Sequence, residues 1–169
     1  TPLQEGLLFH ASTAHTNDDI YAVQLDITFS GVLDLHRLRA ATHSVITRHP
    51  NLAARFCGQF DLPVQIIPAD PAPVWRYLEI DAGTVDLDQQ VHRVCAAERA
   101  AVCKLADQPA FRALVIRIGR GRHRFVLTFH HIVMDGWSLP ILLSEIFAGY
   151  YGQHLPAPAP YRSFVTWLA

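Results

Sequence analysis

Apolar residues along the chain follow two periods, and these separate the expected strands from the expected helices. Alternation of apolar and polar side chains over residues 21–29 indicates a strand with one buried face, because neighbouring side chains on a strand point to opposite sides. Spacings of three and four are typical of amphipathic helices and predict helices over residues 35–49, 87–105 and 139–150. Asp34 is placed to cap the first of these, and Pro50 to end it. A short helix is expected over residues 3–11.

Short runs rich in β-branched and aromatic residues, separated by turn residues, indicate further strands. They lie at residues 52–57, 64–67, 74–80, 111–118 and 124–129. The last two runs flank Gly119-Arg120-Gly121, which predicts a hairpin. This order of strands and helices predicts an α/β fold, an α+β sandwich whose mixed, mostly antiparallel sheet is flanked by helices, rather than a doubly wound parallel sheet.

Composition limits the size of the unit and the class of its partners. With 169 residues, 50% of them hydrophobic and 17% charged, the chain can form one domain or one large lobe. A formal net charge of −1 without a Lys/Arg run argues against nucleic acid or a membrane surface as the main partner. No apolar run reaches the roughly 18 residues of a membrane span. Three cysteines without CxxC spacing fit reduced thiols in the cytoplasm.

The candidate chemistry lies in the run HHIVMDG at residues 130–136, between a predicted strand and a predicted helix. Because adjacent side chains on a strand face opposite ways, His130 and His131 cannot both enter one cavity. We predict that His130 is held in the packing and that His131 faces a reactant. The same argument makes the pair a poor chelator, and the ten histidines are dispersed, so we expect no metal site.

The residues after the two histidines connect the strand to the next helix. Ser138 is placed to cap that helix, and Asp135 to brace the turn. Gly136 allows a backbone conformation or a close approach that a side chain would block. Trp137 and Trp167 are interpreted as core or lobe-interface aromatics.

Several segments resemble the motifs of one family, in that family's order. Residues 1–10 (TPLQEGLLFH) are similar to its opening motif, residues 48–56 (RHPNLAARF) to its second, residues 130–138 to its signature, and residues 161–167 to its fourth. The chain thus resembles the N-terminal half of a condensation domain of a nonribosomal peptide synthetase, within the chloramphenicol acetyltransferase-like superfamily. Gln4 and His10, in the opening motif, are expected to support the fold.

The resemblance implies a two-lobed, V-shaped domain with its site in the tunnel between the lobes. Residues 1–169 would be the N-terminal subdomain of a longer protein, with the C-terminal subdomain absent. Residues 156–160 (PAPAP) would be a stiff connector before a last helix.

The resemblance also implies the reaction. The amine of an acceptor aminoacyl thioester attacks a donor acyl or peptidyl thioester, and both are held on 4′-phosphopantetheine arms of carrier proteins. His131 would act as general base or hold the amine, and the Gly136 N–H is a candidate oxyanion donor. No cofactor bound to the chain is expected. Expected partners are the donor and acceptor peptidyl carrier proteins, the C-terminal subdomain and an adjacent adenylation domain, in the cytoplasm.

Alternatives to condensation stay open. The chain could belong to a related carrier-dependent acyltransferase with another acceptor, or be a non-catalytic lobe that docks carrier proteins or tailoring enzymes. The isolated lobe is expected to be inactive. The opening motif further resembles domains that accept a donor ending in a D-residue.

Two positions depart from the family pattern. Ala53 stands where the family has an arginine that can pair with the signature aspartate. Arg55 would share its strand face, so we predict that Arg55 or another arginine neutralises Asp135. Ser163 stands where an aspartate is common, which puts a polar contact there in doubt.

Overall fold

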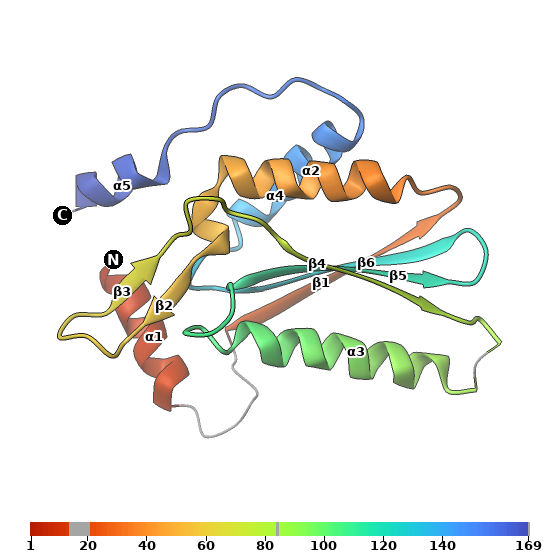
Figure 1. The fold of residues 1–169 in the computed structure, drawn as a ribbon, viewed down its shortest axis with the longest axis horizontal. Coiled ribbons are helices and arrows are strands. Elements are labelled where there is room, and N and C mark those ends of the chain that lie inside the picture. The colour runs from red at the N-terminus through yellow and green to blue at the C-terminus, as the bar shows by residue number, and fades with distance from the viewer. Residues whose placement is uncertain (14–20, 84, 169) are drawn as a thin grey trace.

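The computed structural model describes residues 1–13, 21–83 and 85–168, which form two helical layers around a central sheet (Figure 1). The sheet has the strand order β1-β6-β5-β4. These strands are β1 (Ala22–Ser30), β4 (Val74–Ile80), β5 (Phe111–Ile118) and β6 (Arg122–His130). Strand β6 runs antiparallel to both neighbours, and β4 runs parallel to β5. The predicted mixed, mostly antiparallel sheet is confirmed.

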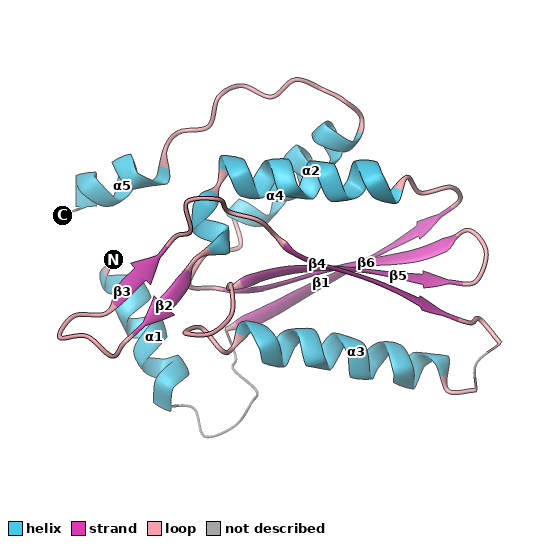
Figure 2. Ribbon diagram, in the orientation of Figure 1, coloured by secondary structure: helices cyan, strands magenta, loops and turns pink. Residues whose placement is uncertain are grey.

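Helices cover both faces of this sheet (Figure 2). Helices α2 (Leu35–Arg48) and α4 (Ser138–Tyr150) lie on one face, and α3 (Leu87–Val102) lies on the other. Helix α3 is the crossover between the parallel strands β4 and β5, which a short turn could not join. The predicted cap of α2 is confirmed, because the Asp34 side chain accepts a hydrogen bond from the Arg37 backbone N–H at 2.9 Å.

The hairpin between β5 and β6 depends on its two glycines. Gly119 and Gly121 adopt positive φ angles of 63° and 68°, a region that other residues enter at a cost. A Cβ at Gly119 would also lie 2.9 Å from the Cβ of Ala82. The turn sets the register in which Phe111 at the start of β5 faces Phe129 near the end of β6.

Alternation along β5 and β6 divides the core into two clusters. Phe125, Leu127 and Phe129 face α2 and α4, together with the buried helix residues Leu38 and Ile146. Leu114, Ile116 and Val126 face α3 in the smaller cluster. The end of β6 is therefore fixed by packing on both faces, and the segment that follows leaves the sheet at a defined place.

The predicted strand over residues 52–57 is wrong in its first half. Pro50–Ala53 form a 3-10 helix, η1, and only Arg55–Cys57 form the strand β2, which pairs with β3 (Val64–Ile66) in a separate two-stranded sheet. Proline at the first helical position fixes φ and needs no N–H partner, so it continues the chain from α2 as a helical turn. Leu52 and Ala53 are buried by this turn rather than by sheet alternation.

The remaining elements lie at one end of the sheet. Helix α1 (Pro2–Thr13) packs beside β2 and β3, and α5 (Tyr161–Leu168) follows a segment, residues 153–160, without helix or strand (Figure 1). Helix α3 ends at Val102, before the predicted residue 105. Within the described residues no helix is long and apolar enough to cross a bilayer.

Candidate active site

The two signature histidines make different contacts at the end of β6. His130 is the last strand residue and is fully buried, with its ring centroid 6.1 Å from that of Tyr21. Its Nδ1 accepts a hydrogen bond from the Ile132 backbone N–H at 3.0 Å. The His131 ring lies edge-on to Phe129, with the two ring centroids 6.1 Å apart. His130 is therefore part of the packing, and His131 is half-buried at the surface of the lobe.

The proton on the neutral His131 ring is placed by a backbone carbonyl. Its Nδ1 lies 3.1 Å from the carbonyl oxygen of Met134. Because a carbonyl oxygen can only accept a hydrogen bond, Nδ1 carries the proton in this contact. In the neutral ring Nε2 is then the nitrogen with the free lone pair. This nitrogen can accept a proton or a hydrogen bond from a bound group.

The loop between β6 and α4 is held by two side-chain amides from distant parts of the chain. The Gln4 amide, on α1, donates to the Ile132 carbonyl at 3.0 Å. The Asn51 amide, on η1, donates to the Val133 carbonyl at 3.2 Å. The sequence predicted that Gln4 supports the fold, and it did not single out Asn51. The available signal was that both lie in the first two family-like motifs.

Asp135, rather than Ser138, supplies the side-chain acceptor at the start of α4. Its Oδ1 accepts hydrogen bonds from the Ser138 backbone N–H at 2.8 Å and from the Ser138 hydroxyl at 2.6 Å. Trp137 occupies the N-cap position and its side chain makes no capping bond, so Asp135 satisfies the first helical N–H from outside the helix. The hydroxyl bond first, and the backbone bond second, hold the pKa of Asp135 below its ordinary value. The predicted cap by Ser138 is wrong, whereas Asp135 does brace this turn.

Arg55 does not pair with Asp135. Across the described part of the chain no arginine forms an ion pair with Asp135, and Arg55 lies exposed on β2. The prediction assumed one continuous strand through Ala53 and Arg55, but η1 ends at Ala53 and breaks the alternation. Hydrogen bonds from Ser138 take the place of the expected arginine.

Within this lobe, Gly136 has neither the special backbone conformation nor the close approach that the sequence analysis offered as reasons for a glycine. Positive φ occurs at four glycines of the described chain, at positions 31, 119, 121 and 152, and Gly136 is not among them. A Cβ at Gly136 would meet no atom within 4 Å. The space beside its backbone is therefore open, next to the loop that carries His131.

An ionic cluster joins α2 to α4 just behind the loop, and sequence reasoning missed it. Glu145 accepts a hydrogen bond from Arg48 Nε at 3.1 Å and lies 2.8 Å from His49 Nε2. Burial alone would raise the pKa of Glu145, but the bonds from Arg48 and His49 outweigh it and lower the pKa. The Arg48 guanidinium also donates to the Pro156 carbonyl at 2.8 Å, which ties down the proline-rich segment.

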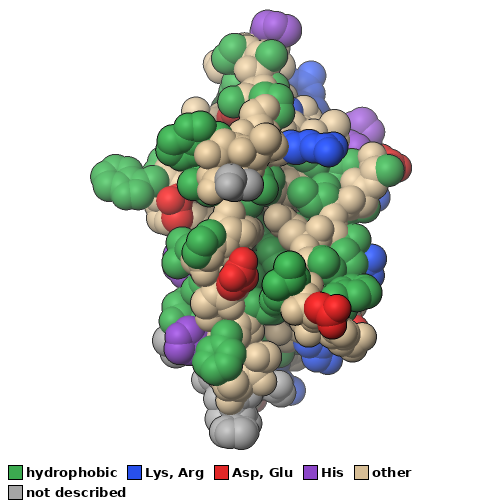
Figure 3. All heavy atoms as spheres, turned by 90° about the vertical axis from the view of Figure 1, so that its left-hand side faces the viewer, with side chains coloured by type: hydrophobic (Ala, Val, Ile, Leu, Met, Phe, Trp, Pro, Cys, Tyr) green, Lys and Arg blue, Asp and Glu red, His purple; other side chains and the backbone are tan. Residues whose placement is uncertain are grey.

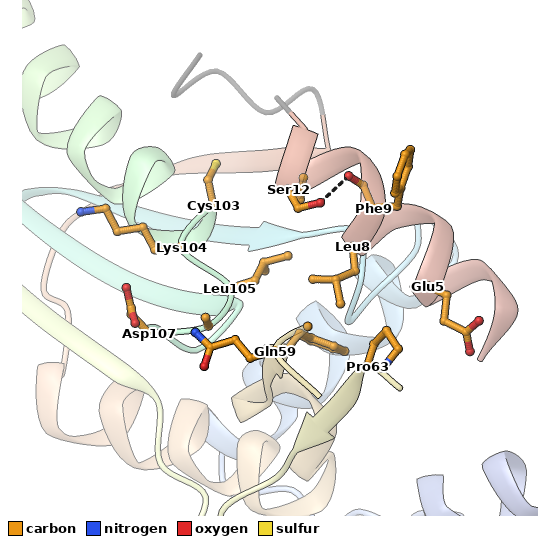
Figure 4. A pocket seen from close by; sticks show the side chains of 14 residues that line it. Glu5, Leu8, Phe9, Ser12, Gln59, Pro63, Cys103, Lys104, Leu105 and Asp107 are labelled. Atoms are coloured by element: carbon orange, nitrogen blue, oxygen red, sulfur yellow. Dashed lines mark hydrogen bonds between the residues drawn. The ribbon is translucent and has the colours of Figure 1, made fainter. Parts of the chain in front are cut away.

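Two hollows lie near these elements. One of about 170 Å³ is lined by Asn51, Val133, Met134 and Ser138 among others, beside the signature loop. A larger one of about 560 Å³ lies between α1, β2 and the residues after α3, lined by Leu8, Phe56 and Leu105 (Figure 4). His131 lines neither. The described residues contain no group of three or more metal-ligating side chains.

Comparisons with known proteins agree along the chain. The Condensation domain family matches residues 1–169. Bacitracin synthase 3 from Bacillus licheniformis is 34% identical over 172 residues, covering 98% of this chain and 3% of that protein. Chondramide synthase cmdD from Chondromyces crocatus is 31% identical over 158 residues, covering 89% of this chain and 4% of that protein. The chain thus spans a few per cent of these relatives' length.

Solved structures share the fold at lower identity. The first condensation domain of the calcium-dependent antibiotic synthetase superposes with a TM-score of 0.73 and 23% identity, over 94% of this chain and 39% of that one. The X-domain structure in complex with OxyB from teicoplanin biosynthesis gives a TM-score of 0.81 and 19% identity, over 99% of this chain and 36% of that one. The chain therefore belongs to the condensation-domain family of nonribosomal peptide synthetases, and it forms the N-terminal lobe of the chloramphenicol acetyltransferase-like fold.

Proposed function

We propose that this lobe supplies the histidine side of an amide-forming condensation site, and that His131 is its catalytic residue. One observation carries the proposal: the Nδ1 proton of His131 is engaged by the Met134 carbonyl, which leaves Nε2 as the basic nitrogen on a half-buried ring. The substrates are a donor acyl or peptidyl thioester and an acceptor aminoacyl thioester, each on a phosphopantetheine arm of a carrier protein.

In the reaction the acceptor amine attacks the carbonyl carbon of the donor thioester and forms a tetrahedral intermediate. His131 Nε2 takes the proton that the amine nitrogen must lose, and the imidazolium returns it to the departing sulfur as the C–S bond breaks. The same lone pair could instead hold the amine by a hydrogen bond. We assign the Gly136 N–H as donor to the oxyanion, supported by the open space beside this residue.

Thioesters are already activated, so much of the catalysis falls to holding two tethered reactants together. Correct placement of two reactants can supply about 7–11 kcal/mol of the barrier. That placement needs walls on both sides of the acceptor and donor arms. We therefore propose that the C-terminal lobe completes the site and that residues 1–169 alone are inactive.

The proposal includes the setting of the enzyme. The partners are donor and acceptor peptidyl carrier proteins and an adjacent adenylation domain, in a cytoplasmic synthetase. The chain holds no cofactor of its own, and the phosphopantetheine arms arrive with the carriers.

The test follows the acceptor carrier protein by intact-protein mass spectrometry. The complete condensation domain is incubated with a loaded donor and a loaded acceptor, as wild type, as His131→Ala and as His43→Ala, a control on the exposed face of α2. We expect the donor mass on the acceptor with wild type and His43→Ala, and a loss of at least about 100-fold with His131→Ala.

Other outcomes would point elsewhere. Equal transfer by wild type and His131→Ala would remove His131 from the chemistry. No transfer by either, with carriers still bound, would favour the docking-lobe alternative, and transfer only to an alcohol acceptor would favour the related acyltransferase. A donor ending in a D-residue is the first substrate to use, with its L-epimer for comparison.

A further inference from the structure

The carbonyls of three consecutive residues after His131 each accept a hydrogen bond from a side chain. Ile132 accepts from Gln4, Val133 from Asn51, and Met134 from the His131 ring itself. The two amides come from positions 128 and 82 residues earlier in the chain, on α1 and η1. Two separate elements therefore converge on the backbone that holds the His131 proton.

Among the described residues, the other hydrogen bonds of this stretch involve its backbone N–H groups. The described backbone bonds are those from the His131 N–H to the Tyr21 carbonyl at 2.9 Å, from the Val133 N–H to the His130 carbonyl at 3.1 Å, and from the Ile132 N–H to His130 Nδ1. All three engage N–H groups of the segment and leave the carbonyls of residues 132–134 to other donors. The side chains of Ile132, Val133 and Met134 are buried, which fixes their depth but not the direction of their carbonyls. A hydrogen bond weakens steeply as its angle departs from linearity, so carbonyl direction decides whether Met134 holds the proton.

We propose that Gln4 and Asn51 are positioning residues that keep the neutral His131 ring in its Nδ1–H form. By fixing the carbonyls of Ile132 and Val133, the two amides fix the peptide planes that lead to the Met134 carbonyl. Loss of either donor lets that carbonyl turn away, and the proton then moves to Nε2 in part of the population. A ring protonated on Nε2 has no lone pair directed at the acceptor amine. The link to catalysis rests on the proposed function, whereas the effect on the proton does not.

The variants remove the donors while keeping side-chain shape. Gln4→Glu and Asn51→Asp replace each amide NH₂ by an acceptor, and Gln4→Met and Asn51→Leu remove it without adding charge. Gln24→Glu is the matched control, because the Gln24 amide donates to the Cys95 carbonyl and the Thr128 hydroxyl on the opposite face of the sheet. All are made in the complete condensation domain, and far-ultraviolet circular dichroism checks that each is folded.

The first readout is the ring-nitrogen NMR spectrum of the complete domain labelled with ¹⁵N-histidine. The spectrum is recorded at alkaline pH, where an imidazole is neutral. The His131 signals are identified by their loss in His131→Gln. We expect an unprotonated Nε2 in wild type and in Gln24→Glu, and a mixture of the two neutral forms in the Gln4 and Asn51 variants. An unchanged His131 spectrum in all four variants would overturn the proposal.

The second readout is carrier-to-carrier transfer. We expect kcat to fall between about 10- and 100-fold in the Gln4 and Asn51 variants with KM for the acceptor little changed, because misplacement of a reacting group acts on the chemical step. A shifted proton with wild-type kcat would show that the positioning is real but that the proposed role of His131 is wrong. If His131→Ala abolishes transfer while the Gln4 and Asn51 variants keep the wild-type His131 spectrum, the proposed function of His131 stands. The positioning role of Gln4 and Asn51 is then wrong.

Discussion

At the scale of single residues, Ser138 makes the contact with Asp135 that the sequence had predicted for an arginine. Asp135 was expected to need an arginine, yet the Ser138 N–H and hydroxyl satisfy its carboxylate. The same contact places the start of α4 directly after the loop that bears His131. Removal of the Asp135 carboxylate should therefore affect both the stability of α4 and the order of the loop.

We expect Asp135→Ala to lower the free energy of unfolding by about 1 kcal/mol at pH 7, since the carboxylate acceptor of the Ser138 N–H and hydroxyl is lost. Asp135→Asn keeps an acceptor and should cost less. Because the folded-state pKa of Asp135 is lowered, its ionised form stabilises the fold above the unfolded pKa of about 3.9, and this contribution is lost as pH falls through the folded pKa. Urea unfolding from neutral to acid pH should show wild type and Asp135→Asn converging, and a constant gap would contradict it.

At the scale of elements, α2 and α4 pack as a pair on one face of the sheet because small residues meet between them. A Cβ at Gly149 would lie 3.2 Å from the Cβ of Ala41, so the two backbones approach closely there. The Glu145 cluster with Arg48 and His49 fastens the same pair nearer the loop. The position of α4, and with it the end of the signature loop, depends on this contact.

Ala41→Leu should separate the two helices and lower the free energy of unfolding by about 1–3 kcal/mol, the usual cost of overpacking. Ala40→Leu on the exposed side of the same helix is the matched control and should stay within about 0.5 kcal/mol of wild type. Chemical denaturation of both variants measures the difference. Equal stabilities would show that the helices can move apart freely.

At the scale of the whole molecule, apolar side chains gather at the end of the lobe formed by α1, β2, β3 and α5 (Figure 3). Trp167 is 79% exposed and Trp137 is 88% exposed, so neither belongs to the core of this lobe, which was one of the two predicted roles. No described residue of α5 is buried. Apolar surface of this kind marks contacts with other protein surfaces.

For residues 1–169 studied alone, we expect a second copy to cover part of this surface. Sedimentation velocity should show a mean mass that rises with concentration. Phe164→Ser combined with Trp167→Ser should reduce the rise by removing exposed apolar surface, whereas Ser163→Ala on the same helix should not. A monomer at every concentration, or association unaffected by the double change, would contradict this expectation.

Patterns local in sequence were enough to predict most elements and to select residues 130–136 as the candidate reactive segment. Strand alternation predicted that His130 and His131 differ in burial, helical spacing located α2, α3 and α4, and the glycines at 119 and 121 marked the hairpin. Prediction failed where a proline interrupted the strand that the residue pattern indicated. Pro50 turned the start of the expected strand into η1, and this break removed the argument that brought Arg55 to Asp135.

The sequence by itself determined the family and the fold class and singled out His131 as the candidate catalytic residue, because each depends on residue order within one motif or one element. Only the tertiary structure decided which side chains contact the signature loop and which ion pairs join the elements. Gln4 and Asn51 reach the loop, Glu145 joins Arg48 and His49, and the buried Glu98 pairs with Arg112 at 2.6 Å. Most of these contacts link residues far apart in the chain. Their geometry follows from how helices pack on the sheet, which no local period of side chains specifies.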